Sequence, residues 1–88
     1  MHAVVVRVTI EDFDAAVAAL REQVVPRVKQ VPGFVTGYWT RKEEDGLSMI
    51  VFESEEGAQR AAEMLPTVTP PQGVTVESVE VREVVAHA

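Results

Sequence analysis

Four stretches of the chain combine β-branched residues with the two-residue hydrophobic spacing of a strand, so we predict a β-strand over each. In the last stretch the valine alternation changes phase after Val76, which predicts a β-bulge near Glu77 and Ser78. A strand that pairs first with its own sheet and then with another subunit's sheet would show the same change. The predicted strands are Ala3 to Thr9, Phe34 to Arg41, Leu47 to Glu53 and Val74 to about Val85.

Two other stretches show the three- and four-residue spacing of amphipathic helices. Thr9 is the predicted N-cap of the first helix, and Asp12 completes an approximate capping box. Pro26 removes one backbone hydrogen bond, so we predict a kink near Glu22–Pro26. Ser54 is the predicted N-cap of the second helix. The apolar stripes are Phe13, Val17, Leu20, Val24, Val28 and Val31 in the first helix and Ala58, Ala61, Ala62 and Leu65 in the second.

Two tight turns are predicted between these elements. In Val31-Pro32-Gly33-Phe34, the proline presets φ at the second position of a type II turn, and the glycine adopts the positive φ of the third. Glu43-Glu44-Asp45-Gly46 is polar and ends in glycine, so we predict that the second and third strands form a hairpin.

The order strand, helix, strand, strand, helix, strand is that of the ferredoxin-like (βαββαβ) fold. We therefore predict one α+β domain over residues 1–88, with a four-stranded antiparallel sheet and both helices on one face. The other face would be wet in a monomer, yet the first and third strands carry apolar residues on both faces. An uncovered apolar face marks an interaction surface, so we predict a homodimer in which two sheets pack face to face.

The core of so short a chain is marginal. A domain of 88 residues buries only ~60–65% of its unfolded surface. No cysteine is present, so no disulfide supplements that core. Either the core packs unusually well or a partner subunit completes it, and the second option agrees with the predicted homodimer.

The chain has 14 acidic and 8 basic residues, which gives a formal net charge of −6. This balance disfavours nucleic acid and anionic membranes as partners, because both bind clustered Lys and Arg. The start of the chain lacks the character of a signal peptide, and no apolar run approaches the ~20 residues that span a bilayer. We therefore expect a soluble, cytoplasmic protein.

A βαββαβ chain of this length with a Pro-Gly-Phe turn after its first helix resembles the dimeric α/β-barrel superfamily. Within it, the chain looks most like the antibiotic-biosynthesis monooxygenase group. The likeness includes the Trp-bearing strand after Phe34 and the run Phe-Glu-Ser-Glu-Glu from Phe52 to Glu56. It covers the whole chain and implies a dimeric α/β barrel. Members include cofactor-free quinone-forming oxygenases, heme degraders, isomerases and ligand-sensing domains, so this fold does not fix a function.

The chain departs from the catalytic members of this group. Heme degraders carry a histidine on the second helix, with an asparagine and a tryptophan nearby. The predicted helix from Ser54 to Leu65 has no His or Trp, and the chain has no Asn, so we expect no heme and no other cofactor. Quinone-forming members use Asn, Trp, Tyr and Arg, of which Trp39, Tyr38 and several arginines are present. The resemblance therefore leaves open whether the protein is an enzyme.

Trp39 has two interpretations. Its indole stacks on an aromatic ligand beside the gap that Gly37 leaves, or it covers Gly37 and packs in a dimer interface, where Trp is enriched. Tyr38 points to the opposite face of the strand, so we predict that the two aromatic rings do not share a pocket.

Arg7 is an unusual residue in a strand that is otherwise rich in valine. It anchors an anionic oxygen of a ligand, or it pairs with a carboxylate on the last strand, such as Glu77 or Glu80. Arg41 shares the face of Trp39 but lies at the hairpin end, where we expect solvent around it.

His2 and His87 would lie on neighbouring terminal strands, but two histidines without a fixed carboxylate make a poor metal site. We expect both to be frayed ends and predict no metal site. The chain also lacks a catalytic Cys, a Ser-His-Asp spacing and a glycine-rich phosphate loop.

Two function hypotheses remain. The first is a homodimeric protein that binds a small apolar or aromatic ligand between its sheet and helices. Its sharpest version is a cofactor-free oxygenase of a quinol-type substrate, in which Arg7 stabilises an anion. The alternative is a non-catalytic dimerisation or ligand-sensing module, which an interior without a cavity of ~300 Å³ would favour. The predicted pocket is lined by Phe13, Val17, Leu20 and Met49, and the predicted ligand-binding residues are Arg7, Phe13, Trp39 and Met49.

Overall fold

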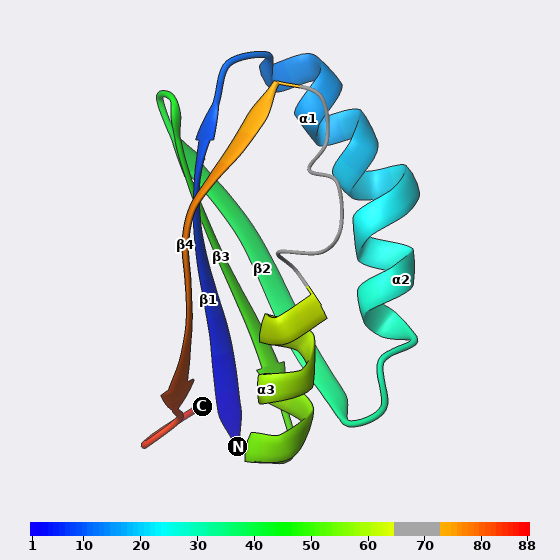
Figure 1. Cartoon of the computed structure of the whole chain (residues 1–88), viewed down its shortest axis with the longest axis vertical. Helices are drawn as coiled ribbons and strands as arrows, with labels where there is room; N and C mark the ends of the chain where they lie inside the picture. Colours follow the sequence, from blue (N-terminus) through cyan, green and yellow to red (C-terminus); the bar gives the residue numbers. More distant parts are fainter. Residues whose placement is uncertain (65–72) are drawn as a thin grey trace.

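The computed structural model describes residues 1–64 and 73–88 and contains one four-stranded antiparallel sheet in the order β2-β3-β1-β4 (Figure 1). Both helical segments of the described chain cover the same face of that sheet (Figure 1). This confirms the predicted α+β arrangement, which is consistent with a ferredoxin-like fold. The strands are β1 (His2–Ile10), β2 (Phe34–Lys42), β3 (Asp45–Phe52) and β4 (Val74–Glu83), and the helical elements are α1 (Phe13–Ala19), η1 (Leu20–Val24), α2 (Val25–Lys29) and α3 (Glu55–Met64).

The turn before β2 and the irregularity in β4 are confirmed. Gly33 has a φ of +86°, and the backbone N–H of Phe34 donates to the carbonyl of Val31 at 3.1 Å, as a type II turn requires. On β4, the partner of β1 changes between Arg7 and Val8, so that Glu77 is the extra residue of a bulge. The predicted end of the second helix at Leu65 lies outside the described residues.

The first helix begins later than predicted. Thr9 lies inside β1, which continues to Ile10 through its pairing with Val74, so Thr9 is not the N-cap. Asp12 is the N-cap instead, and its carboxylate accepts a hydrogen bond from the backbone N–H of Ala15 at 3.1 Å. Ser54 caps α3 as predicted, since its hydroxyl accepts from the backbone N–H of Gly57 at 3.1 Å.

The helical irregularity lies where Pro26 predicts it. A π-helical turn, η1, separates α1 from α2 and ends at Val24, just before Val25 and Pro26 begin α2. Because proline has no backbone N–H, it cannot continue the i to i−4 ladder, and a wider turn accommodates the missing bond.

The hairpin between β2 and β3 uses its residues differently from the prediction. Glu43, not the glycine, adopts a positive φ of 56° in this turn. Gly46 belongs to β3 and is buried, and a Cβ built on it would lie 2.5 Å from Cγ2 of Val8 and 3.0 Å from Cδ1 of Ile10. This glycine therefore makes room for side chains of β1 rather than for a turn.

The core lies between α3 and the sheet. Val4, Phe52 and Ala58 have no exposed surface, and the ring of Phe52 meets that of Phe34 edge to face, with centroids 6.3 Å apart. Val28 and Val31, near the end of the first helix, also pack against this core. The backbone of α3 closely approaches β1, β3 and β4, whereas no comparable approach joins α1, η1 or α2 to a strand of the described chain.

Candidate functional site

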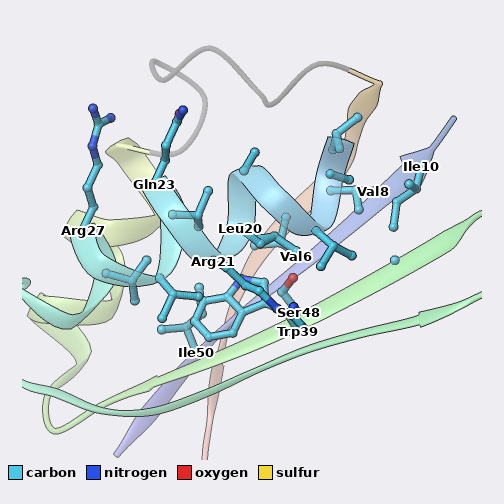
Figure 2. A pocket seen from close by; sticks show the side chains of 18 of the residues that line it. Val6, Val8, Ile10, Leu20, Arg21, Gln23, Arg27, Trp39, Ser48 and Ile50 are labelled. Atoms are coloured by element: carbon cyan, nitrogen blue, oxygen red, sulfur yellow. The ribbon is translucent and has the colours of Figure 1, made fainter. Parts of the chain in front are cut away.

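A half-open cavity of about 1130 Å³ lies between the first helical segment and the sheet (Figure 2). It exists because α1 and η1 stand away from the strands that α3 packs against directly. A volume of this size exceeds the ~300 Å³ that small-ligand sites need. Its walls are mostly apolar, and its central lining consists of Val6, Val8, Ile50 and Trp39 from the sheet with Leu20 and Val24 from η1.

Polar residues are a minority of the lining of this cavity. Ser48 of β3 is directly opposite Trp39 of β2 in the sheet register, and Figure 2 shows the two side chains together on the sheet wall. On the helix, Gln23 and Arg27 point away from the sheet, while Arg21 extends toward Trp39 (Figure 2). Such an arrangement suits a ligand that is apolar over most of its surface and polar at one point.

The indole of Trp39 lies over Gly37 of the same strand, β2. A Cβ built on Gly37 would lie 2.9 Å from Cη2 of the indole, so the ring covers the glycine as one interpretation predicts. The indole also lines the cavity, so it faces the helices and not the exposed face of the sheet. Tyr38 projects from the opposite face with 63% of its surface exposed, which confirms that the two rings do not share a pocket.

Phe13 lines the cavity, as predicted, and carries a cation on its ring. The guanidinium carbon of Arg41 lies 3.5 Å from the centroid of the Phe13 ring, a cation–π contact that joins the start of α1 to the end of β2. Arg41 is exposed, as predicted from its position at the hairpin end, and the Phe13 ring is an additional neighbour. One of its nitrogens also donates to the carbonyl of Glu43 at 3.5 Å, a long bond.

Met49 lies elsewhere than predicted. It projects from the face of β3 opposite the helices, where it is 43% exposed, and it does not line the cavity between sheet and helices. The physical reason is the two-residue period of the strand: Ser48 and Ile50 face the helices, so Met49 cannot. The sequence alone left both faces of this strand apolar, and nothing in it told them apart.

Arg7 also lies on the face without helices. It is exposed and borders a separate hollow of about 400 Å³, together with Leu47 and Glu77. Its guanidinium forms no hydrogen bond or ion pair with any residue in the described part of the chain. The predicted pairs do not form: Glu77 accepts from the hydroxyl of Thr9 at 2.9 Å, and Glu80 pairs with Arg82 at 2.9 Å.

On the face of the sheet that no helix covers, side chains of neighbouring strands form rows across the strands. The central row joins Val5, Met49 and Tyr38 on neighbouring strands, and the next joins Arg7, Leu47 and Thr40. Leu47 is 39% exposed, so three large apolar side chains of this face contact solvent in the single chain. We call the surface formed by Val5, Tyr38, Leu47, Met49 and Val51 the open sheet face.

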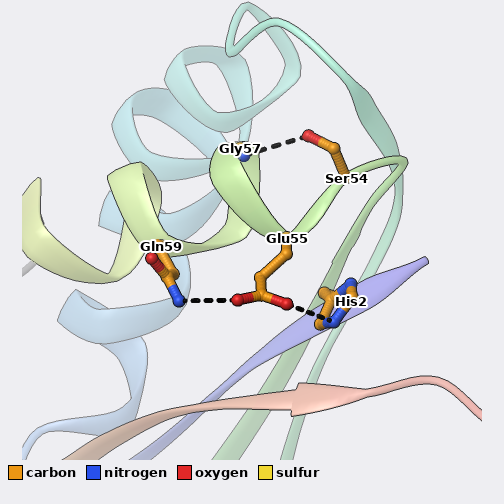
Figure 3. Close-up of polar contacts among 5 residues, drawn as sticks. All are labelled: His2, Ser54, Glu55, Gly57 and Gln59. Atoms are coloured by element: carbon orange, nitrogen blue, oxygen red, sulfur yellow. Dashed lines mark hydrogen bonds and ion pairs between the residues drawn. The ribbon is translucent and has the colours of Figure 1, made fainter.

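His2 is not a frayed end. Its ring lies at the start of β1 with 21% of its side chain exposed, and its Nε2 atom is 3.2 Å from a carboxylate oxygen of Glu55 on α3 (Figure 3). Gln59 donates to the other oxygen of Glu55 at 3.1 Å. The Nδ1 atom of His2 is buried without a hydrogen-bond partner among the described residues. This contact ties the first strand to the N-terminal end of α3.

Sequence reasoning missed Ser48 and the contact between His2 and Glu55. Ser48 carried a weak signal, since it is the single polar residue on the inner face of an apolar strand. The contact between His2 and Glu55 had none, because it depends on how α3 lies across the sheet. In residues 1–64 and 73–88, no three His, Asp or Glu side chains are grouped so as to hold a metal ion. Nor does any helix there have the length and hydrophobicity of a bilayer crossing.

Comparison with known proteins adds no family to this description. The chain matches no protein-family model, and no curated protein matches it significantly. The likeness to the monooxygenase-like group therefore stays an expectation from the sequence pattern.

Proposed function

We propose that this protein binds a small apolar or aromatic molecule in the cavity between the first helical segment and the sheet. The observation that supports it is the cavity itself, about 1130 Å³ in a chain of only 88 residues. The apolar side chains that line this cavity lack part of the dispersion contacts and burial that would stabilise the fold. A bound apolar ligand would supply those contacts and stabilise the folded state.

We propose ligand binding for this protein and no chemical reaction. The cofactor-free oxygenase hypothesis relies on Arg7 to stabilise an anion, and Arg7 is on the face of the sheet opposite the cavity. Inside the cavity, Ser48 and Trp39 offer a hydroxyl and an indole N–H. Both donate hydrogen bonds, which suits recognition of a ligand oxygen.

A substitution that fills the cavity with a larger side chain tests this function. Leu20→Trp adds bulk at a lining position, and we expect it to weaken binding of the apolar fluorescent probe N-phenylnaphthylamine by about tenfold or more. Leu47→Trp is the matched control, because it adds the same bulk on the open sheet face. Titrations followed by probe emission measure both affinities. Equal affinity of the probe for both variants and the wild type would overturn the cavity as the binding site.

We further propose that a second copy of the chain covers the open sheet face, which gives a homodimer. Its support is the exposure of Tyr38 and Met49 at 63% and 43%, in rows that continue across three strands. A contiguous apolar face of this kind marks an interaction site, and two copies related by a two-fold axis would bury it in both. This proposal is independent of the ligand, since the cavity lies on the other face.

Sedimentation velocity at micromolar concentration tests the dimer. We expect the wild type to sediment as a dimer and Met49→Glu as a monomer, because a buried unpaired carboxylate strongly opposes association. Val85→Glu is the control, since Val85 is 87% exposed beyond the end of β4. A monomeric wild type at these concentrations would remove the dimer and leave the cavity proposal standing.

A further inference from the structure

Arginines gather around the cavity although the chain as a whole is acidic. The described residues that line it include Arg21, Arg27 and Arg41, against Glu22 as their single acidic residue. The whole chain has 14 acidic and 8 basic residues, so this local excess of positive charge reverses the overall balance. The surroundings of the cavity are therefore cationic in an anionic protein.

These three arginines have no carboxylate partner among the described residues. The arginines that do form ion pairs are Arg60, with Glu56 at 2.7 Å, and Arg82, with Glu80 at 2.9 Å, and neither lines the cavity. An unpaired guanidinium keeps its hydrogen-bond donors available, and its planar fork matches carboxylate-like anions.

Two of the three arginines come from the two walls of the cavity, Arg21 from η1 on the helical wall and Arg41 from β2 on the sheet wall. Arg27 points away from the sheet, whereas Arg21 extends from η1 toward Trp39 and Ser48 (Figure 2). Arg41 is two residues beyond Trp39 on β2, which places it on the same strand face. Since β2 is an edge strand of the sheet, the Arg41 side of the cavity lies at the border of the fold.

We propose that the ligand of this cavity is an amphipathic anion, with an apolar body among the valines and one anionic group at the β2 edge between Arg21 and Arg41. This inference rests on the proposed binding function and adds the ligand class. A carboxylate or sulfonate at this border keeps much of its hydration while it gains charge-assisted hydrogen bonds from guanidinium groups. The apolar body fills the volume beside Trp39, and Ser48 offers one further hydroxyl at that end.

The contacts of Arg41 fit this placement. Its guanidinium rests on the Phe13 ring and makes one long hydrogen bond, of 3.5 Å, to the carbonyl of Glu43. A flat guanidinium stacked on an aromatic ring still has N–H groups at its edge, which point outward in the plane. Arg41 is thus held in place and retains donors for an anion.

A matched pair of fluorescent probes tests this inference. N-phenylnaphthylamine and anilinonaphthalene sulfonate share an apolar body, and only the second carries an anionic group. We expect Arg21→Gln and Arg41→Gln each to weaken binding of the sulfonate by about three- to tenfold and to change binding of the neutral probe by less than about twofold. Added salt is expected to weaken the sulfonate selectively in the wild type.

The controls separate local from overall charge. Arg60→Gln removes the same charge from α3 outside the cavity, and we expect it to leave both affinities within about twofold of the wild type. Arg21→Lys keeps the charge but loses the planar fork, so we expect its sulfonate affinity to lie between those of the wild type and Arg21→Gln. Circular dichroism confirms that each variant folds.

The outcomes distinguish the proposed anionic ligand from the proposed binding function of the cavity. Equal losses for both probes, equal losses in Arg60→Gln, or no loss in either cavity variant would overturn the anionic ligand and keep the cavity as an apolar binding site. Failure of both probes to bind the wild type would overturn the binding function itself, and this inference with it.

Discussion

The two helical segments rest on one sheet in different ways. Helix α3 lies directly on the sheet, and we call this part of the fold the closed half. Its residues Ala58, Phe52 and Val4 have no exposed surface. On the same face of the sheet, α1 and η1 are separated from Val8, Ser48 and Trp39 by the cavity, and we call this part the open half. One half is therefore closely packed, while the other contains unfilled volume.

The difference follows from residue size and from backbone regularity. Small side chains let α3 approach closely, since Ala58 lies under the helix with no exposed surface. The first segment instead contains the wide turn η1 before Pro26. It packs against the core cluster of Val4, Phe52 and Ala58 near its end, through Val28 and Val31. An interrupted helix anchored at one end does not pack uniformly along the sheet.

The largest effect that we expect is from truncation in the closed half. Phe52→Ala should lower the free energy of unfolding by about 3–5 kcal/mol, because it opens a cavity in a filled core and removes the contact with Phe34. Leu20→Ala, at the border of an existing cavity, should cost about 1 kcal/mol. Urea unfolding measures both. Equal costs would mean that the open half is as tightly packed as the closed half.

A smaller effect is expected from enlarging alanines. Ala58→Leu should lower the free energy of unfolding by about 1–3 kcal/mol, since no space remains around a residue with 0% exposure. Ala19→Leu makes the same change on the first helix, where the side chain lines the cavity, and should be neutral within about 0.5 kcal/mol. Thermal unfolding of both variants compares the room in the two halves. A stable Ala58→Leu would contradict close packing under α3.

The smallest effect is expected at the border of the closed half. A double-mutant cycle of His2→Ala and Glu55→Ala should give a coupling of about 0.5 kcal/mol, because Glu55 is 61% exposed and water screens the contact. The matched cycle of Glu56→Ala and Arg60→Ala measures a fully surface pair on the same helix. Zero coupling between His2 and Glu55 would show that the buried ring acts through packing alone.

The sequence by itself determined the order of the elements, the type II turn at Pro32 and Gly33, the bulge at Glu77, the irregularity before Pro26 and the Ser54 cap. Each of these depends on local backbone preferences or on a residue's own hydrogen-bonding groups, which neighbours in the chain reveal. It also placed Trp39 and Tyr38 on opposite faces of β2, through the two-residue period of the strand, but it did not decide which of the two faces the helices.

Only the tertiary structure decided which face of β3 the helices cover, and with it the place of Met49. Since both faces of that strand are apolar, its pattern carried no information on burial. The gap under η1, the contact of Arg41 with Phe13, and the contact of His2 with Glu55 likewise depend on distances between elements far apart in the chain. Periodicity fixes which side a residue faces, whereas the separation of a helix from a sheet is set by all the side chains between them.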